Sequence, residues 1–189
     1  MKKINFKKCK ECKEQFLPQF FNQKFCFKES CREIEIKRIL DRQKRTQKKE
    51  WTKRKQETKE RLKTRSERLN DLQKIFNKFI RLRDKKQKCI SCNTFLKGVY
   101  DAGHYFSVGN YPELRFNEDN VHAQCKYCNL HLHGNINEYS INLPKRIGEN
   151  RFEMLKNKRG EPLKLTVQEI ESLKQEYLLK IKAYENNGN

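Results

Sequence analysis

The sequence lacks any long run of apolar residues, and it is poor in acidic side chains. Only 35% of its 189 residues are hydrophobic, while 36% are charged. The missing apolar run excludes a membrane-spanning helix, and the first nine residues lack the apolar segment of a signal peptide. We therefore expect a cytoplasmic protein with a modest core, or several small modules stabilised by something other than apolar burial.

Positively charged residues dominate the charged part of the sequence. Lysine and arginine number 44 against 24 aspartates and glutamates, which gives a formal net charge of +20. Such an excess predicts a polyanionic partner, and nucleic acid is the usual one. A membrane surface is the rival partner, but no apolar segment is available to anchor the chain in a bilayer.

Eight cysteines form the strongest pattern in the chain. They occur as four close pairs, which make two quartets: Cys9, Cys12, Cys26 and Cys31, then Cys89, Cys92, Cys125 and Cys128. Two thiolates from each of two close pairs suit one tetrahedral zinc ion, so the spacing predicts two structural zinc sites rather than disulfides or redox cysteines. The first quartet predicts a zinc knuckle over residues 1–31. Its phenylalanines form a miniature core or stack on exposed bases.

The middle of the chain predicts helix. Residues 32–70 contain no glycine or proline and carry 16 basic against 7 acidic side chains, mostly of good helix formers. This composition predicts one long exposed basic helix, or two with a break, which acts as a phosphate-tracking arm or as a plain linker. Residues 71–83 have apolar positions at helical spacing and should pack on the next module, so 32–88 forms one helical segment.

The second quartet encloses a short mixed module at residues 89–150. Residues 99–101 and 121–124 are expected as strands joined by a turn-rich loop, and 137–146 as a helix that Pro144 kinks or ends. In the final segment, 151–189, Thr166 and Glu169 have the spacing of a capping box, which predicts a C-terminal packing helix.

The histidines and asparagines of this module suit phosphodiester hydrolysis. A neutral imidazole can deprotonate water, and a divalent cation held by oxygen and nitrogen ligands can stabilise negative charge on phosphate. His104, Asn120 and the cluster Asn129, His131 and His133 provide such groups in order. His122 lies on an expected strand and is interpreted as structural or phosphate-facing, and His131 as a surface residue or a ligand.

These residues carry a resemblance to a known family. Asp101-Ala-Gly-His104-Tyr, Asn120-Val-His-Ala-Gln-Cys125 and Cys128-Asn129-x3-His133-Gly-Asn135 look like an HNH (ββα-metal) nuclease, and more closely like the NinG (Rap) family of phage recombination proteins. The resemblance implies an α+β, zinc-stapled protein with a small HNH-type ββα-metal module, joined by a long basic helix to the N-terminal zinc knuckle. One departure is Gly103, because many HNH sites have an acidic residue immediately before the histidine.

The resemblance also implies roles. His104 would be the general base, and Asn120 would position the ββ turn or the base. Asp101, Asn129 and His133 would bind a catalytic Mg²⁺ or Mn²⁺ ion. His133 is preferred over His131 because residues four apart share a helical face.

The implied activity is cleavage of branched DNA, such as Holliday junctions and D-loops, in the bacterial host of a phage, without a small-molecule cofactor. A homodimer is a further hypothesis, because symmetric resolution of a four-way junction needs two sites. The first alternative is a non-catalytic zinc-ribbon protein that coats or bridges DNA, and the second is an RNA-binding module.

Overall fold

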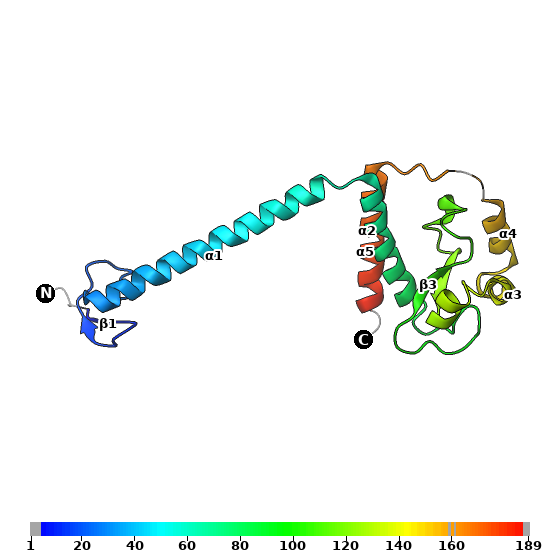
Figure 1. Cartoon of the computed structure of the whole chain (residues 1–189). Coiled ribbons are helices and arrows are strands. Elements are labelled where there is room, and N and C mark those ends of the chain that lie inside the picture. Colours follow the sequence, from blue (N-terminus) through cyan, green and yellow to red (C-terminus); the bar gives the residue numbers. More distant parts are fainter. Residues whose placement is uncertain (1–4, 159, 161, 187–189) are drawn as a thin grey trace. The chain divides into compact units, whose positions relative to one another are not determined.

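The chain divides into two compact units between Leu62 and Lys63 (Figure 1). The computed structural model describes residues 5–158, 160 and 162–186. It contains both helices and short antiparallel strands, in agreement with a mixed α and β chain. The division lies inside segment 32–88, which the sequence treats as one helical segment.

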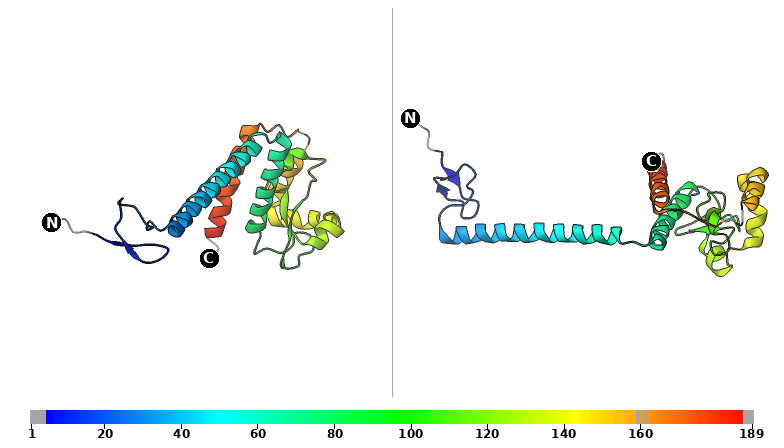
Figure 2. Two further views of the ribbon diagram at one scale, coloured as in Figure 1. Left: turned by 60° about the vertical axis from the view of Figure 1, so that its left-hand side comes forward. Right: turned by 90° about the horizontal axis from the view of Figure 1, so that it is seen from above.

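The first unit consists of a small hairpin followed by one long helix. Strands β1 (Lys7–Lys8) and β2 (Gln15–Phe16) pair antiparallel, and α1 (Glu29–Arg61) then runs for 33 residues, or about 50 Å. Figure 2 shows α1 as a continuous helix from two further directions. Cys31 is its only buried residue, as expected for so polar a helix. No helix in the described residues is long and apolar enough to cross a bilayer.

In the second unit, α2 (Arg65–Arg83) packs along α5 (Val167–Asn186) (Figure 1). Their ion pairs, Arg68 with Glu171 at 2.8 Å and Lys78 with Glu185 at 2.9 Å, show that the two helices run parallel. The core between them contains Phe76, Phe79, Ile80, Ile170, Tyr177 and Ile181. Both helices begin with a capping box, and the one predicted at Thr166 is confirmed.

The break between α1 and α2 agrees with the two-helix alternative. It spans residues 62–64, and Thr64 ends it by accepting a hydrogen bond from the Glu67 backbone N–H at 3.2 Å. The Glu67 carboxylate accepts in return from the Thr64 N–H at 2.8 Å. Sequence composition does not locate this break, because Lys63 and Thr64 continue the polar pattern of the preceding residues.

A two-stranded hairpin forms the centre of the second unit. Strand β3 (Asp101–His104) pairs antiparallel with β4 (Val121–Gln124), and Asp101 lies opposite Gln124 while His104 lies opposite Val121. The second strand agrees with the prediction, but the first begins where the predicted strand 99–101 ends. Pairing fails before Asp101 because Gly98 adopts a left-handed φ of 63° and Val99 is exposed.

Two further helices cover the other side of the hairpin. A short 3₁₀ turn (Pro112–Leu114) precedes β4, and a π-helical turn (Tyr127–His131) follows it. Helix α3 (Ile136–Ile147) contains Pro144 and continues for three residues beyond it before Gly148 ends the helix. Helix α4 (Glu149–Asn157) is an element that the prediction of segment 151–189 omitted. Tyr139, Leu143 and Leu155 pack with Ile90 and Leu114 in a second core.

Candidate functional site

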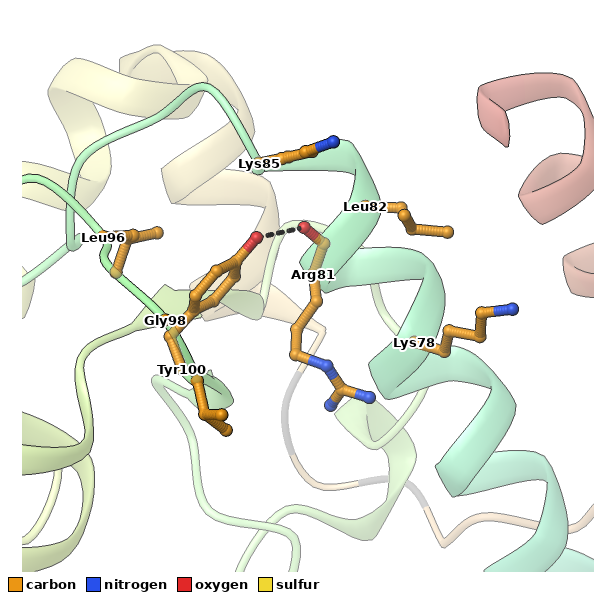
Figure 3. Close-up of a pocket in the computed structure, with 8 residues that line it drawn as sticks. Lys78, Arg81, Leu82, Lys85, Leu96, Gly98 and Tyr100 are labelled. Atoms are coloured by element: carbon orange, nitrogen blue, oxygen red, sulfur yellow. Dashed lines mark hydrogen bonds between the residues drawn. The ribbon is translucent and has the colours of Figure 1, made fainter. Parts of the chain in front are cut away.

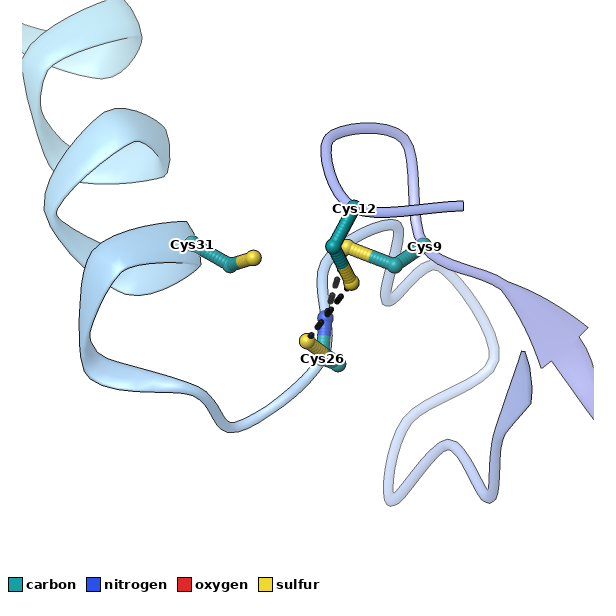
Figure 4. Close-up of side chains that lie close together, drawn as sticks. All are labelled: Cys9, Cys12, Cys26 and Cys31. Atoms are coloured by element: carbon teal, nitrogen blue, oxygen red, sulfur yellow. Dashed lines mark hydrogen bonds between the residues drawn. The ribbon is translucent and has the colours of Figure 1, made fainter. Parts of the chain in front are cut away.

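The first cysteine quartet lies between the β1–β2 hairpin and the first turn of α1. Cys9, Cys26 and Cys31 are buried, and Cys12 is half-buried (Figure 4). The Cys26 backbone N–H donates to the Cys9 sulfur at 3.3 Å. Burial raises the pKa of the Cys9 thiol, but backbone N–H groups of neighbouring residues outweigh it and lower the pKa to about 6. This environment favours the thiolate that a metal requires.

The second quartet joins two segments that are distant in sequence. Backbone N–H groups again face the sulfurs, because Cys125 N–H donates to Cys89 at 3.3 Å and Cys128 N–H to Cys125 at 3.4 Å. Burial raises the pKa of Cys92, but the side chain and backbone of Thr94 act in the opposite direction and lower it to about 7. A metal here would clamp the start of the module to the end of β4.

Both quartets fit a tetrahedral zinc ion. Within each quartet, all sulfurs lie within 4.8 Å of one another. Zn–S bonds of about 2.3 Å in a tetrahedron place the sulfurs about 3.8 Å apart. The sulfurs of Cys12 and Cys26 are 3.6 Å apart, and those of Cys92 and Cys125 are 3.8 Å apart. All eight cysteines are free thiols in the structure. Both clusters could therefore hold a metal ion, as the spacing predicts.

His104 is the last residue of β3, and its ring is held by a backbone carbonyl. Its Nε2 lies 3.0 Å from the carbonyl oxygen of Arg115. A carbonyl oxygen only accepts, so Nε2 carries the proton and Nδ1 of the neutral ring keeps its lone pair. Burial lowers the pKa of His104 below its usual value. The imidazole is therefore neutral at pH 7, and no described residue forms a hydrogen bond with its Nδ1.

Arg115 is fixed from the other side by α2. Its guanidinium donates to Gln73 Oε1 at 2.8 Å and to Asn70 Oδ1 at 3.1 Å. Since the Arg115 carbonyl orients His104, the outer face of α2 sets the direction of the imidazole through one intermediate residue. No motif in the sequence indicates this connection, because the three residues are common surface types.

Asn120 is completely buried and holds the loop between the two strands. Its side-chain oxygen accepts from the Phe106 N–H at 2.8 Å, and its nitrogen donates to the carbonyls of Phe106 and Leu114 at 3.0 and 3.1 Å. A fully buried side chain cannot touch a substrate. Its contacts are compatible with the predicted role of positioning the ββ turn, because Phe106 and Leu114 belong to the loop that follows His104.

A cluster of side-chain oxygens lies on the opposite face of β3 from His104. Asn129 Nδ2 donates to Asp101 Oδ2 at 3.1 Å. A Cβ atom added to Gly103 would lie 2.1 Å from Gln124 Oε1 and 3.3 Å from Asn129 Oδ1. The position before His104 therefore has no room for a side chain, because the Gln124 amide occupies it.

The oxygen of this glutamine is buried and has no hydrogen-bond donor among the described residues. Its nitrogen donates to Ser91 Oγ at 2.6 Å and to the Gly134 carbonyl, and that carbonyl requires a donor, so the amide orientation is fixed. An unpaired buried oxygen costs roughly 1–3 kcal/mol. Beside a carboxylate, it fits the oxygen ligands that Mg²⁺ or Mn²⁺ prefers.

His133 lies beyond the helical turn that carries Asn129. The helical turn ends at His131, and His133 has a left-handed φ of 49°. Asn129 and His133 therefore do not share a helical face, and the reason for preferring His133 as a ligand is wrong. Among the described residues, its side chain makes no hydrogen bond, and it is exposed. The structure brings Asp101 and Asn129 into contact, and the role of His133 as a ligand stays a prediction.

The other two histidines have simple environments. His122 is buried on β4, with Nδ1 3.3 Å from the Tyr139 hydroxyl, and burial lowers its pKa to about 3. It is structural rather than phosphate-facing. His131 is exposed and lies against the Tyr127 ring, with 5.7 Å between ring centroids.

A basic groove of about 540 Å³ lies beside the start of β3 (Figure 3). Lys78 and Arg81 of α2, with Lys85 just beyond its end, form one wall, and Leu96, Val99 and Tyr100 form the other. The Tyr100 hydroxyl donates a hydrogen bond to the Arg81 carbonyl at 2.9 Å, and this bond joins the two walls. Tyr100 immediately precedes β3, so the groove places three cations beside the start of the hairpin that carries His104.

Sequence reasoning missed Gln124 and Arg115. The signal for Gln124 was available, because alternation along β4 and pairing with β3 place it opposite Asp101. Gln124 can present its side-chain oxygen as a metal ligand because Gly103 has no side chain in its way. Only the three-dimensional packing shows this. Arg115 gave no signal, since it acts through a main-chain carbonyl.

Comparison with known proteins identifies relatives over almost the entire chain. The family model described as bacteriophage lambda NinG protein matches residues 1–187. Protein ninG of Escherichia phage lambda is 36% identical over 193 residues, which cover 96% of this chain and 94% of that protein. Protein ninG of Salmonella phage P22 is 36% identical over 194 residues, with 96% and 95% covered.

A third relative, protein ninG of Enterobacteria phage H19B, is 37% identical over 194 residues, with 96% of this chain and 94% of that protein covered. No solved structure matches the chain. Since the family model and these full-length relatives agree, the chain belongs to the NinG family of bacteriophage proteins.

Proposed function

We propose that this chain is a metal-dependent DNA endonuclease that hydrolyses phosphodiester bonds in branched recombination intermediates, such as Holliday junctions and D-loops. The observation that carries the proposal is His104, whose tautomer is fixed by the Arg115 carbonyl so that Nδ1 is free to accept a proton. Its lowered pKa keeps this nitrogen unprotonated at neutral pH. The choice of branched DNA rests on the resemblance to phage recombination proteins.

Two neighbouring groups support the chemistry. Adjacent residues of a strand face opposite sides, so His104 and the oxygens beside Gly103 flank the end of β3 from two directions. Asp101, Gln124 and Asn129 would hold the divalent ion, which would offset negative charge on the reacting phosphate. Asn120 holds the loop that follows His104 and acts as a positioning residue.

Basic surfaces support DNA as the substrate. The groove lined by Lys78, Arg81 and Lys85 lies beside the residues that precede β3, and Arg81 and Lys85 form no ion pair within the described residues. In the other unit, α1 carries 13 basic and 7 acidic side chains, nearly all exposed. Cationic side chains on such surfaces bind phosphates and make affinity depend on salt. We place the activity in the cytoplasm of the bacterial host.

A labelled four-way junction tests the proposal. The zinc-loaded wild type should cut it with Mg²⁺ or Mn²⁺ and should not cut without added metal. His104→Ala should bind the junction but cut at least about 100-fold more slowly, which is the lower limit for a lost general base. His131→Ala is the matched control and should cut like the wild type, because this histidine is exposed and its ring lies against Tyr127.

A non-catalytic DNA-binding protein is the second candidate, favoured by the long exposed basic face of α1. It predicts that wild type and His104→Ala bind the junction equally and that neither cuts it. The homodimer hypothesis has a separate test, because two cuts across one junction need two sites. Sedimentation that finds only monomers, with and without a junction, would reject it.

A further inference from the structure

The six phenylalanines of residues 5–28 fall into two groups. Phe16 and Phe25 are 8% and 7% exposed and pack against the first cysteine quartet. The other four are exposed, and Phe20 and Phe21 are the most exposed, at 68% and 97%. The miniature core around the metal site therefore uses two rings and leaves an adjacent pair in solvent.

The turn that carries Phe20 and Phe21 is held by its own hydrogen bonds. The Gln23 side-chain oxygen accepts from the Gln19 N–H at 2.7 Å, and its nitrogen donates to the Phe25 carbonyl at 3.0 Å. The Gln23 N–H donates to the Phe20 carbonyl at 3.1 Å. The Phe21 carbonyl also accepts from the Lys7 ammonium. The two rings thus stand on a braced turn, which lowers the entropic cost of binding through them.

The charge around these rings is strongly positive. Residues 5–28 contain six lysines and two glutamates. Both glutamates are paired, Glu11 with Arg38 at 2.7 Å and Glu14 with Lys28 at 2.5 Å. The Lys7 ammonium lies 5.3 Å from the Phe21 ring centroid. A partner that satisfies both features has flat π faces and a dense negative charge, and nucleic acid with unpaired bases has both.

We propose that Phe20 and Phe21 form a stacking platform for unpaired DNA bases, with the surrounding lysines on the flanking phosphates. A duplex hides the faces of its bases, so this platform selects single-stranded or branched regions. The inference deepens the proposed function, because it provides a way to recognise a branch without reading a base sequence. It concerns binding alone and needs neither His104 nor a catalytic metal.

The test is binding of the full zinc-loaded chain to DNA without Mg²⁺ or Mn²⁺. Fluorescence anisotropy at one salt concentration would compare a labelled single strand with the duplex of the same sequence. The variant Phe20→Ala/Phe21→Ala should bind the single strand at least about fivefold more weakly, the factor for roughly 1 kcal/mol of lost stacking. Its affinity for the duplex should change less than twofold.

Leu17→Ala is the matched control, because Leu17 is an exposed aliphatic residue of the same module and has no ring to stack. It should bind both DNAs like the wild type. Phe21→Leu keeps the apolar volume and serves if the double variant loses zinc; it too should weaken single-strand binding. Equal losses on single strand and duplex, or no loss on either, would overturn the platform.

These outcomes are distinct from failure of the nuclease. If the wild type cuts junctions but the ring variants bind single strands normally, only the platform is overturned. If the rings matter for single-strand binding but the wild type cuts nothing, only the endonuclease proposal is overturned.

Discussion

Replacing Gly103 by alanine should destabilise the second unit, although most strands tolerate this exchange. The new Cβ would lie 2.1 Å from Gln124 Oε1, 3.0 Å from its Cδ and 3.3 Å from Asn129 Oδ1. Side chains avoid contacts shorter than 3.0 Å, so the Gln124 amide must move. It is fully buried and is held by Ser91 and Gly134, so any movement weakens those hydrogen bonds.

The expected cost follows from two opposing effects. Overpacking a buried site typically costs about 1–3 kcal/mol. Alanine restricts the unfolded chain more than glycine does, and this effect stabilises the folded state by about 0.4–1 kcal/mol. The free energy of unfolding should therefore fall by about 1–2 kcal/mol. Because the displaced oxygen belongs to the candidate metal centre, binding of Mn²⁺ should weaken as well.

Denaturant unfolding of the zinc-loaded protein measures this effect. Gly109→Ala is the matched control, because no atom lies within 4 Å of its added Cβ, and it should be unchanged or slightly stabilised. The cost of Gly103→Ala should shrink in a Gln124→Ala background, where the clash is absent. A Gly103→Ala protein as stable as the Gly109→Ala control would refute the packing argument.

Three further predictions concern the same unit and the metal clusters. Asp84 is buried and accepts from Arg83 Nε at 2.7 Å, from Arg83 Nη2 at 3.0 Å and from the Ala123 N–H. Asp84→Ala should therefore cost about 3–5 kcal/mol in denaturant unfolding, and Asp84→Asn less. The unfolded His122 ring takes a proton below pH 6.5 while the folded ring stays neutral to about pH 3. Wild type should therefore lose stability as pH falls through this window, by up to about 1.4 kcal/mol per pH unit relative to His122→Gln; parallel curves would contradict this. Metal analysis should find two zinc ions per wild-type chain and one in Cys12→Ser, whereas two in both would contradict the four-cysteine site.

Local rules predicted the parts of the fold that depend on local chemistry. The cysteine spacing located both metal clusters, because four thiolates can reach one ion only if their pairs are close. The capping box at Thr166 located the start of α5, because its two hydrogen bonds involve only residues three apart. The polar composition of residues 32–70 predicted an exposed helix, which α1 confirms as far as Arg61.

Features that depend on packing could not be predicted in the same way. The first strand is displaced from 99–101 to Asp101–His104 because its register is set by pairing with β4, not by its own apolar residues. The preference for His133 assumed that a helix continues past His131. The left-handed backbone at residue 133 shows that it does not continue. Gln124 became a candidate ligand only through the packing of its amide against the bare backbone of Gly103.

Chemical rescue of His104→Ala under single-turnover conditions tests whether His104 is the general base of the cleavage. The variant, loaded with zinc and saturated with a labelled junction and Mn²⁺, would be supplied with increasing imidazole, which can act as a base in the space left by the ring. We expect that the wild type cuts, that the variant is at least about 100-fold slower, and that neutral imidazole restores part of the rate. A wild type that binds the junction without cutting it, or a variant that cuts as fast as wild type, would contradict the account.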